Sequence, residues 1–169
     1  MLVKGHRIAS DAFTSIADGE SLPDGPAIVS LKRYLAERDA LLARFHPIGV
    51  RLETGESPES LRGHLGKVAL VVLHVPTFRD GRAFSSARLL RTRLGYTGEI
   101  RLSGHFLLDQ IAFYIRVGVD AFDIAQNISL DQIEAALNEI SHVYQPSVDG
   151  RATIGDLRRG RARLATAAE

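Results

Sequence analysis

The sequence predicts an α/β protein whose mostly parallel sheet has strands that alternate with helices. Segments typical of buried strands alternate with segments of helical periodicity from Ile48 to Ile140, and the connections between them are short. Val68–Leu73 is a continuous apolar run, which indicates a strand buried on both faces of a sheet. Short crossovers of this kind are right-handed and cover the sheet with helices. A flavodoxin-like open sheet and half of an eight-stranded barrel both fit this pattern.

The N-terminal residues are expected to add strands to this sheet. Residues 1–16 have the mixed polarity of one or two short strands, which would form an antiparallel edge or a dimer arm. Turn signals follow at Asp18-Gly19 and at Pro23–Pro26, before a brief strand at Ala27–Val29.

The first helix is predicted to begin after Ser30, a favourable N-cap residue, and to end near Ala43. One side of it is marked by apolar residues at helical spacing: Leu31, Leu35, Leu42 and Phe45. Pro47 stops the helix, and Ile48–Leu52 is predicted to be a buried parallel strand.

The strongest predicted strand, Val68–Leu73, follows a short helix that begins at Ser57-Pro58-Glu59. Beyond this strand, Ser85 or Ser86 is expected to cap a helix that runs to about Leu94. The order strand, helix, strand is what a parallel sheet requires.

The remaining elements complete the alternation. Glu99–Ser103 and Ala121–Ile124 are predicted strands. A helix between them has an inner stripe of apolar residues: Leu107, Leu108, Ile111, Ala112 and Ile115. Ser129 and Gln132 form a capping box that begins the last helix of the domain.

Length and composition bound the organisation of the chain. The 169 residues predict one α/β domain over residues 1–146, with an N-terminal arm at 1–26, and an Arg- and Ala-rich tail over 147–169. Residues from 151 onward hold five arginines against two acids, and we expect this tail to contribute little to stability.

Charge and composition exclude several classes of protein. The formal net charge of +1 gives no electrostatic reason to expect nucleic acid or a membrane as a partner. The absence of cysteine excludes disulfides, thiolate catalysis and Cys-ligated metal centres. We expect a cytoplasmic protein, because neither a signal peptide nor an apolar run of membrane-spanning length is visible.

Polar residues gather where the predicted strands end. Ligands of parallel sheets bind beyond the carboxyl ends of the strands. That rule places one group of residues on a common rim: Glu53, Thr54, His74, Asp80, Arg82, Ser85, Ser86, Ser103, Gly104, His105, Asp109, Gln126 and Asn127.

The sharpest local signal is Asp80-Gly81-Arg82 at a predicted helix start. Free N–H groups and the helix dipole favour an anion there, such as sulfite, sulfate, phosphate or a carboxylate. The predicted anion-binding residues are Arg82, Ser85, Ser86 and Arg88. The structural alternative is that Asp80 and Gly81 close a turn, Ser85 caps the helix and the arginines pair with acids.

His74, His105 and Asp109 are the candidate catalytic residues of the rim, as acids or bases. Their spacing is not that of a helical metal motif, so we predict no metal site and keep ordinary loop histidines as the alternative. Gly104 is expected to be a structural corner. We predict no cofactor, because a dinucleotide fingerprint and a recognisable flavin motif are missing; flavin binding through other features stays open.

Three residues lie off the inner stripe of their predicted helix: Phe113, Tyr114 and Arg116. Exposed aromatic residues beside an arginine are typical of protein interfaces. They indicate a surface for a homodimer or another partner, and the alternative is a wider core face.

Several separated motifs resemble one family. They are Leu22–Gly25, Tyr34–Arg44, Gly49–Glu53, Phe78–Arg91, Gly95–Glu99, Gly104, Asp109-Gln110 and Gly118–Phe122. In this order they resemble the bacterial family called domain of unknown function 934, over about residues 22–145.

The resemblance implies no established activity. Genes of the family's members lie near those of assimilatory sulfite reductase, and some members carry an oxidoreductase label. The resemblance therefore implies an accessory protein of assimilatory sulfite reduction (sulfur assimilation) that binds a small oxyanion or the reductase. The alternatives are a small enzyme with its site at the strand-end rim and a structural interaction module.

Overall fold

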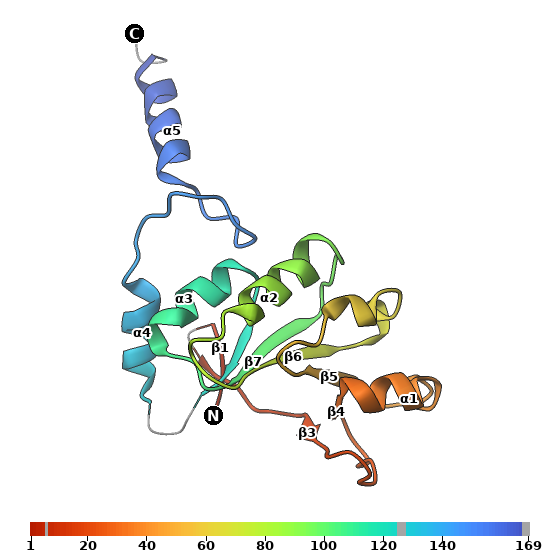
Figure 1. The fold of residues 1–169 in the computed structure, drawn as a ribbon. Coiled ribbons are helices and arrows are strands. Elements are labelled where there is room, and N and C mark those ends of the chain that lie inside the picture. Colours follow the sequence, from red (N-terminus) through yellow and green to blue (C-terminus); the bar gives the residue numbers. More distant parts are fainter. Residues whose placement is uncertain (6, 125–127, 167–169) are drawn as a thin grey trace.

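The computed structural model describes residues 1–5, 7–124 and 128–166, with residues 161–166 described by backbone alone. The described strands form one sheet in the order β2-β1-β8-β7-β6-β5-β4-β3 (Figure 1). The strands are β1 (Leu2–Lys4), β2 (Arg7–Ile8), β3 (Thr14–Ser15), β4 (Ala27–Ser30), β5 (Ile48–Leu52), β6 (Leu70–Val75), β7 (Glu99–Gly104) and β8 (Ala121–Asp123). The helices are α1 (Leu31–Leu42), α2 (Arg82–Thr92), α3 (Leu108–Arg116), α4 (Leu130–Asn138) and α5 (Ile154–Thr166), with 3₁₀ turns η1 (Pro58–Leu61) and η2 (Leu65–Lys67).

The sheet decides between the two predicted topologies. Strands β3 to β8 are parallel and lie side by side in chain order, as in half of an eight-stranded barrel. A flavodoxin-like sheet would reverse this order at one point. Without a reversal, crossovers of one hand place the connecting helices on the same face of the sheet. One core cluster accordingly joins buried residues of α1 to α4 with one face of the strands (Figure 1).

The α/β prediction is confirmed, including the interior position of the strongest strand. β6 pairs in parallel with β5 and β7, and five of its six residues are buried. It begins at Leu70, two residues later than predicted, because the Val68 N–H still donates to Leu65 O at the end of η2 (3.1 Å). β1 pairs antiparallel with β8 and β2, which confirms the predicted N-terminal strand addition.

The buried side of α1 differs from the prediction. Phe45 is 96% exposed and Leu35 is exposed, whereas Tyr34 and Leu41 are buried. Glu37 has non-helical dihedral angles (φ −113°, ψ 16°) inside the helix. Leu31, Tyr34 and Leu41 recur at helical spacing, so they form the buried stripe, and Phe45 lies beyond the end of the helix at Leu42.

Tyr114 also corrects the sequence prediction, because it lies in the core and not on the surface of α3. Its ring stacks on that of Phe84 in α2, with centroids 3.7 Å apart and an interplanar angle of 5°. Phe113 is exposed, as predicted.

The N-terminal segment crosses the helix-free face of the sheet. β2 and β3 form the two edges, so residues 9–13 pass from one edge to the other. Phe13 packs there against a small cluster of Ile28, Leu70 and Val72. Asp11 accepts two hydrogen bonds from Arg101 of β7, at 2.7 and 3.1 Å.

Burial opposes ionisation of Asp11, but hydrogen bonds from Arg101 and from the Phe13 N–H outweigh it and lower its pKa. The crossing segment is therefore held by a charged contact at its centre.

Helix α5 projects away from the sheet and its covering helices (Figure 1). Among the described residues, no helix combines the length and the apolar character needed to cross a membrane.

Candidate functional site

The predicted anion site lies at the start of α2, but this start differs from the prediction. The helix begins at Arg82 with Gly81 as N-cap, so Ser85 and Ser86 lie inside it and neither is the cap. The Asp80 carboxylate accepts the backbone N–H of Arg82 at 3.1 Å and thereby satisfies a free donor of the first turn. This contact explains why the helix begins earlier than the serine positions suggest.

Asp80 also pairs with the side chain of Arg82. The Arg82 Nε and Nη2 atoms donate to the two carboxylate oxygens at 2.9 and 2.7 Å. The side chain of Asp80 is only 10% exposed, and the hydrogen bonds from the Arg82 side chain and backbone lower its pKa to about 2. The chain thus places its own carboxylate where the sequence suggests an external anion.

The space that remains beside this helix start is small. A cavity of about 20 Å³ lies between the ends of β5 and β6 and the first turns of α2. That volume holds about one water molecule. Arg82 and Ser86 line the cavity together with Glu53 and Glu56, whereas Ser85 and Arg88 do not. An oxyanion would have to displace Asp80 from Arg82 to bind here.

His74 meets Ser103 on the helix-free side of the sheet. These residues are in register on β6 and β7, and His74 Nδ1 lies 3.2 Å from Ser103 Oγ. His74 is half-buried. The pair offers a hydroxyl and a base at the carboxyl ends of two neighbouring strands.

The two other catalytic candidates lie apart from this pair. Gly104 has φ +99°, and a Cβ there would lie 2.2 Å from Val75 O, so only glycine fits the corner. His105 follows with an exposed side chain, and Asp109 is exposed in the first turn of α3. Among the described residues, no hydrogen bond or ion pair joins either of them to His74.

Gln126 and Asn127 lie outside the described residues. Elsewhere in the described chain, no three His, Asp or Glu side chains are placed to hold a metal ion together.

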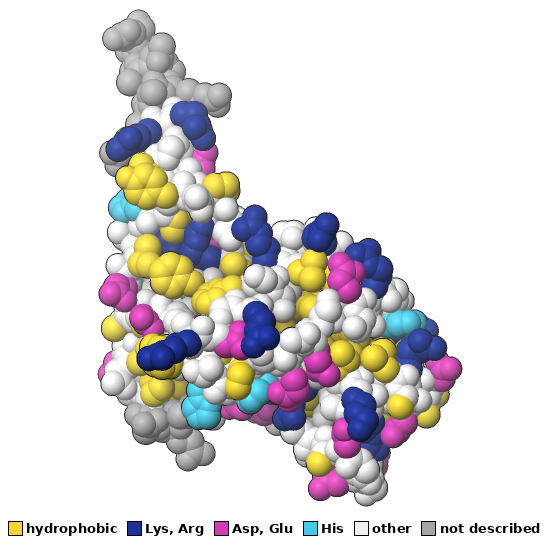
Figure 2. Space-filling view, viewed as in Figure 1, with side chains coloured by type: hydrophobic (Ala, Val, Ile, Leu, Met, Phe, Trp, Pro, Cys, Tyr) yellow, Lys and Arg dark blue, Asp and Glu magenta, His cyan; other side chains and the backbone are white. Residues whose placement is uncertain are grey.

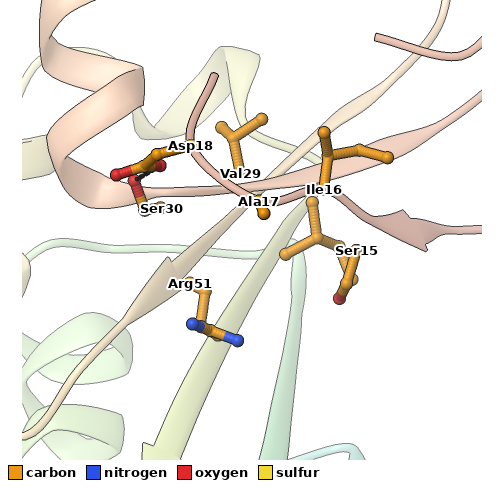
Figure 3. A pocket seen from close by; sticks show the side chains of 8 residues that line it. Ser15, Ile16, Ala17, Asp18, Val29, Ser30 and Arg51 are labelled. Atoms are coloured by element: carbon orange, nitrogen blue, oxygen red, sulfur yellow. Dashed lines mark hydrogen bonds between the residues drawn. The ribbon is translucent and has the colours of Figure 1, made fainter. Parts of the chain in front are cut away.

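A larger pocket opens at the carboxyl ends of β3, β4 and β5. It has a volume of about 270 Å³ and is lined by Arg51, Ser15, Ile16, Ala17, Asp18, Ile28, Val29 and Ser30. Figure 3 shows Arg51 facing this space across from Ser15, with the Asp18–Ser30 pair at its side. The Ser30 hydroxyl donates to Asp18 at 2.6 Å and accepts the Arg33 N–H, because it is also the N-cap of α1.

Arg51 reaches this pocket because of strand alternation. Val50 and Leu52 face the helix-covered core, so the side chain between them points to the opposite face. Arg51 Nε lies 2.8 Å from Glu53, and the two side chains are 45% and 43% exposed. Sequence reasoning missed Arg51, although a charged residue inside an otherwise apolar interior strand is itself a signal.

Two other arginines, Arg91 and Arg101, are structural. Arg91 donates to the carbonyl oxygens of Tyr96 (2.6 Å), Gly98 (2.8 Å) and Gly118 (3.0 Å), and it pairs with Asp120. These contacts lie at the amino ends of β7 and β8, opposite the ligand rim. Arg101 is engaged by Asp11 and Glu99, whereas Arg51 and Arg82 each line a pocket at the carboxyl ends of the strands.

The comparisons with known proteins identify a family. The family model described as "Bacterial protein of unknown function (DUF934)" matches residues 49–154, more than half of the chain. The matched segment runs from β5 to the start of α5 and includes Arg51, His74, Arg82 and Ser103. A search among curated proteins finds no match to this chain.

Proposed function

Since the chain belongs to the DUF934 family of bacterial proteins of unknown function, we propose that it is a cytoplasmic accessory protein of assimilatory sulfite reduction that binds a small oxyanion. The oxyanion would lie in the pocket of Arg51, at the carboxyl ends of β3, β4 and β5. The observation that carries this proposal is the guanidinium of Arg51, which faces an open pocket of about 270 Å³.

The energetics favour this pocket over the start of α2. Arg51 and Glu53 are both about half exposed, and exposed ion pairs contribute only about 0–1 kcal/mol. An oxyanion can therefore replace Glu53 on the guanidinium at little cost, and bidentate hydrogen bonds from arginine suit its geometry. At the start of α2, Arg82 is 66% exposed, but Asp80 is only 10% exposed and accepts two hydrogen bonds from the Arg82 side chain.

Binding at Arg82, with Ser85, Ser86 and Arg88 nearby, stays the alternative prediction. It requires Arg82 to leave Asp80 and the cavity of about 20 Å³ to widen. The helix dipole still favours an anion at this place. One experiment can separate the two sites.

That experiment is calorimetric titration with sulfite, sulfate and phosphate at low salt. Arg51→Gln should weaken oxyanion binding by about 2 kcal/mol, because charge-assisted hydrogen bonds are lost. The matched control is Arg62→Gln, which removes an exposed arginine that also pairs with a glutamate, Glu59 (2.6 Å). If Arg82→Ala abolishes binding and Arg51→Gln does not, the oxyanion lies at the start of α2.

Two partners belong to this proposal. Sulfite reductase is the partner that the family resemblance suggests, and a second copy of this chain is the other. If the chain serves the reductase, adding it to the purified reductase should change the dependence of the rate on sulfite concentration. An unchanged rate at all sulfite concentrations would remove the reductase from the proposal.

A second candidate function is a small enzyme at the same rim. The 3.2 Å distance between His74 Nδ1 and Ser103 Oγ favours it, because histidine can accept a proton from a serine nucleophile. Hydrolysis of an activated ester, such as p-nitrophenyl acetate, tests this function. Activity that Ser103→Ala and His74→Gln both remove would support the enzyme, and activity equal to that of the solvent would contradict it.

A further inference from the structure

Hydrogen bonds hold the start of helix α5 in place, and the rest of the helix extends away from the domain. Thr153 at its start is buried, its hydroxyl donates to Asp156 at 2.6 Å, and the Ile154 N–H donates to Val143 O at 2.8 Å. Beyond this base the helix extends away from the sheet (Figure 1). The direction of the helix is therefore set by its start, and residues 156–160 are exposed.

Such a helix is poorly stable without a partner. It has 13 residues, which is marginal for an isolated helix in water. Gly160 lies in its interior and costs about 1 kcal/mol relative to alanine, and a second glycine, Gly155, lies in its first turn. Leu157 is 44% exposed on its side. Packing of this side against another surface would supply the missing stability.

An apolar groove lies next to the base of α5. One cavity of about 350 Å³ is lined by Phe113, Ile140 and Tyr144, and a neighbouring one of about 510 Å³ includes Leu137 of α4; Arg116 and Arg151 line both. Phe113 and Tyr144 are exposed. Figure 2 shows hydrophobic side chains gathered on the face below α5, with basic side chains around them.

The charges of α4 and α5 are complementary. α4 contains no basic residue, and Asp131, Glu134 and Glu139 at its C-cap are exposed. Within the described chain none of these three carboxylates forms an ion pair. α5 exposes Arg158 and Arg159, and the chain from residue 151 onward holds five arginines against two acids. Within the described chain neither of these two arginines pairs with an acid of α4; Arg159 pairs with Asp156 on the exposed surface of α5 itself (2.6 Å).

We propose that α5 of a second copy of this chain packs in the groove beside α3 and α4, and that the contact is reciprocal. The helix and the groove are neighbours on one molecule. A two-fold axis therefore buries α5 of each copy in the groove of the other copy and closes the assembly as a dimer. The inference rests on the proposed self-association and names its surface; it does not depend on oxyanion binding. Leu157 would meet the apolar groove, while Arg158 and Arg159 would face the acids of α4.

The test is sedimentation velocity of the full chain over a range of concentrations. The wild type should be a dimer, and Leu157→Ser should raise its dissociation constant roughly tenfold or more. The matched control is Leu35→Ser, an equally exposed leucine (48%) on α1, which should leave the constant unchanged.

A charge exchange makes the test specific. Glu134→Arg with Glu139→Arg, and separately Arg158→Glu with Arg159→Glu, should each weaken the dimer, and the four changes together should restore it. A monomeric wild type would refute the self-association and its surface. A dimer that withstands both Leu157→Ser and the charge changes would refute this surface alone.

Discussion

Two buried tyrosines differ in the hydrogen bonds of their hydroxyl groups. The hydroxyl of Tyr96 donates to Val68 O at 3.1 Å, with Glu99 O as a second acceptor at 3.4 Å. The hydroxyl of Tyr114 is equally buried and has no partner among the described residues. Burial, with a further contribution from Asp80, raises the pKa of Tyr114 to about 12.

This difference predicts opposite responses to the same substitution. Tyr96→Phe should lower the free energy of unfolding by about 1–2 kcal/mol, because Val68 O loses its buried donor. Tyr114→Phe should leave stability unchanged or raise it, since it removes an unsatisfied polar atom and keeps the stacked ring. Urea unfolding of both variants measures this. Equal losses would mean that the Tyr114 hydroxyl has a partner in solution.

The pair of Asp80 and Arg82 predicts a pH effect. Because the pKa of Asp80 is lowered to about 2, the stability that its carboxylate contributes is complete above its ordinary pKa of 3.8. That contribution is lost as the pH falls from about 4 through about 2. In an NMR titration, Arg82→Gln should move the pKa back toward 3.8, whereas Arg88→Gln on the same helix should not. A pKa that stays near 2 in Arg82→Gln would mean that other donors hold the carboxylate.

At the scale of elements, Arg91 joins the end of α2 to the starts of β7 and β8. It donates to three carbonyl oxygens and pairs with Asp120, which itself accepts the Ile100 N–H at 2.8 Å. Arg91→Ala should therefore lower the free energy of unfolding by about 3 kcal/mol, because several partners lose a charged donor together. Arg93→Ala, an exposed arginine two residues later, should change it by less than about 0.5 kcal/mol. Chemical denaturation compares the two variants, and similar losses would contradict the structural role of Arg91.

The types of most elements were predictable, but several of their ends were not, and the short helix predicted from Ser57 is replaced by the 3₁₀ turns η1 and η2. Hydrophobic periodicity is decisive for a segment such as β6, which is apolar on both faces. The start of α2 depends instead on one side-chain contact, from Asp80 to the Arg82 N–H, and propensity alone favours the serines. The kink at Glu37 in α1 is likewise invisible to a count of apolar spacings.

At the scale of the whole molecule, the site was harder to predict than the fold. Sequence reasoning found the rim with His74, Ser103 and Arg82, since strand ends can be located from local pattern. It missed Arg51, because the pocket that Arg51 faces is formed by the order of the strands and by the path of the N-terminal segment. Both are non-local, and a single strand of five residues contains no information on them.

The C-terminal tail is expected to contribute little to the stability of the whole molecule. Truncation after Gly150 should lower the melting temperature of dilute protein by no more than about 2–4 °C, which corresponds to about 1 kcal/mol. The reason is that α5 extends away from the body (Figure 1). Thermal unfolding at low and high protein concentration checks this result. A large drop in dilute protein would mean that the tail packs on its own body, against the predicted division of the chain at residues 146 and 147.

We propose above that Arg51 holds an oxyanion at the carboxyl ends of the parallel strands. The most direct measurement is a crystal structure of the chain soaked in selenate, an analogue of sulfate whose selenium can be located by anomalous scattering. We expect an anomalous peak in the pocket of about 270 Å³, with selenate oxygens within hydrogen-bond distance of the Arg51 guanidinium and Glu53 turned away. A peak at the start of α2, or an empty pocket with the pair of Arg51 and Glu53 intact, would contradict it.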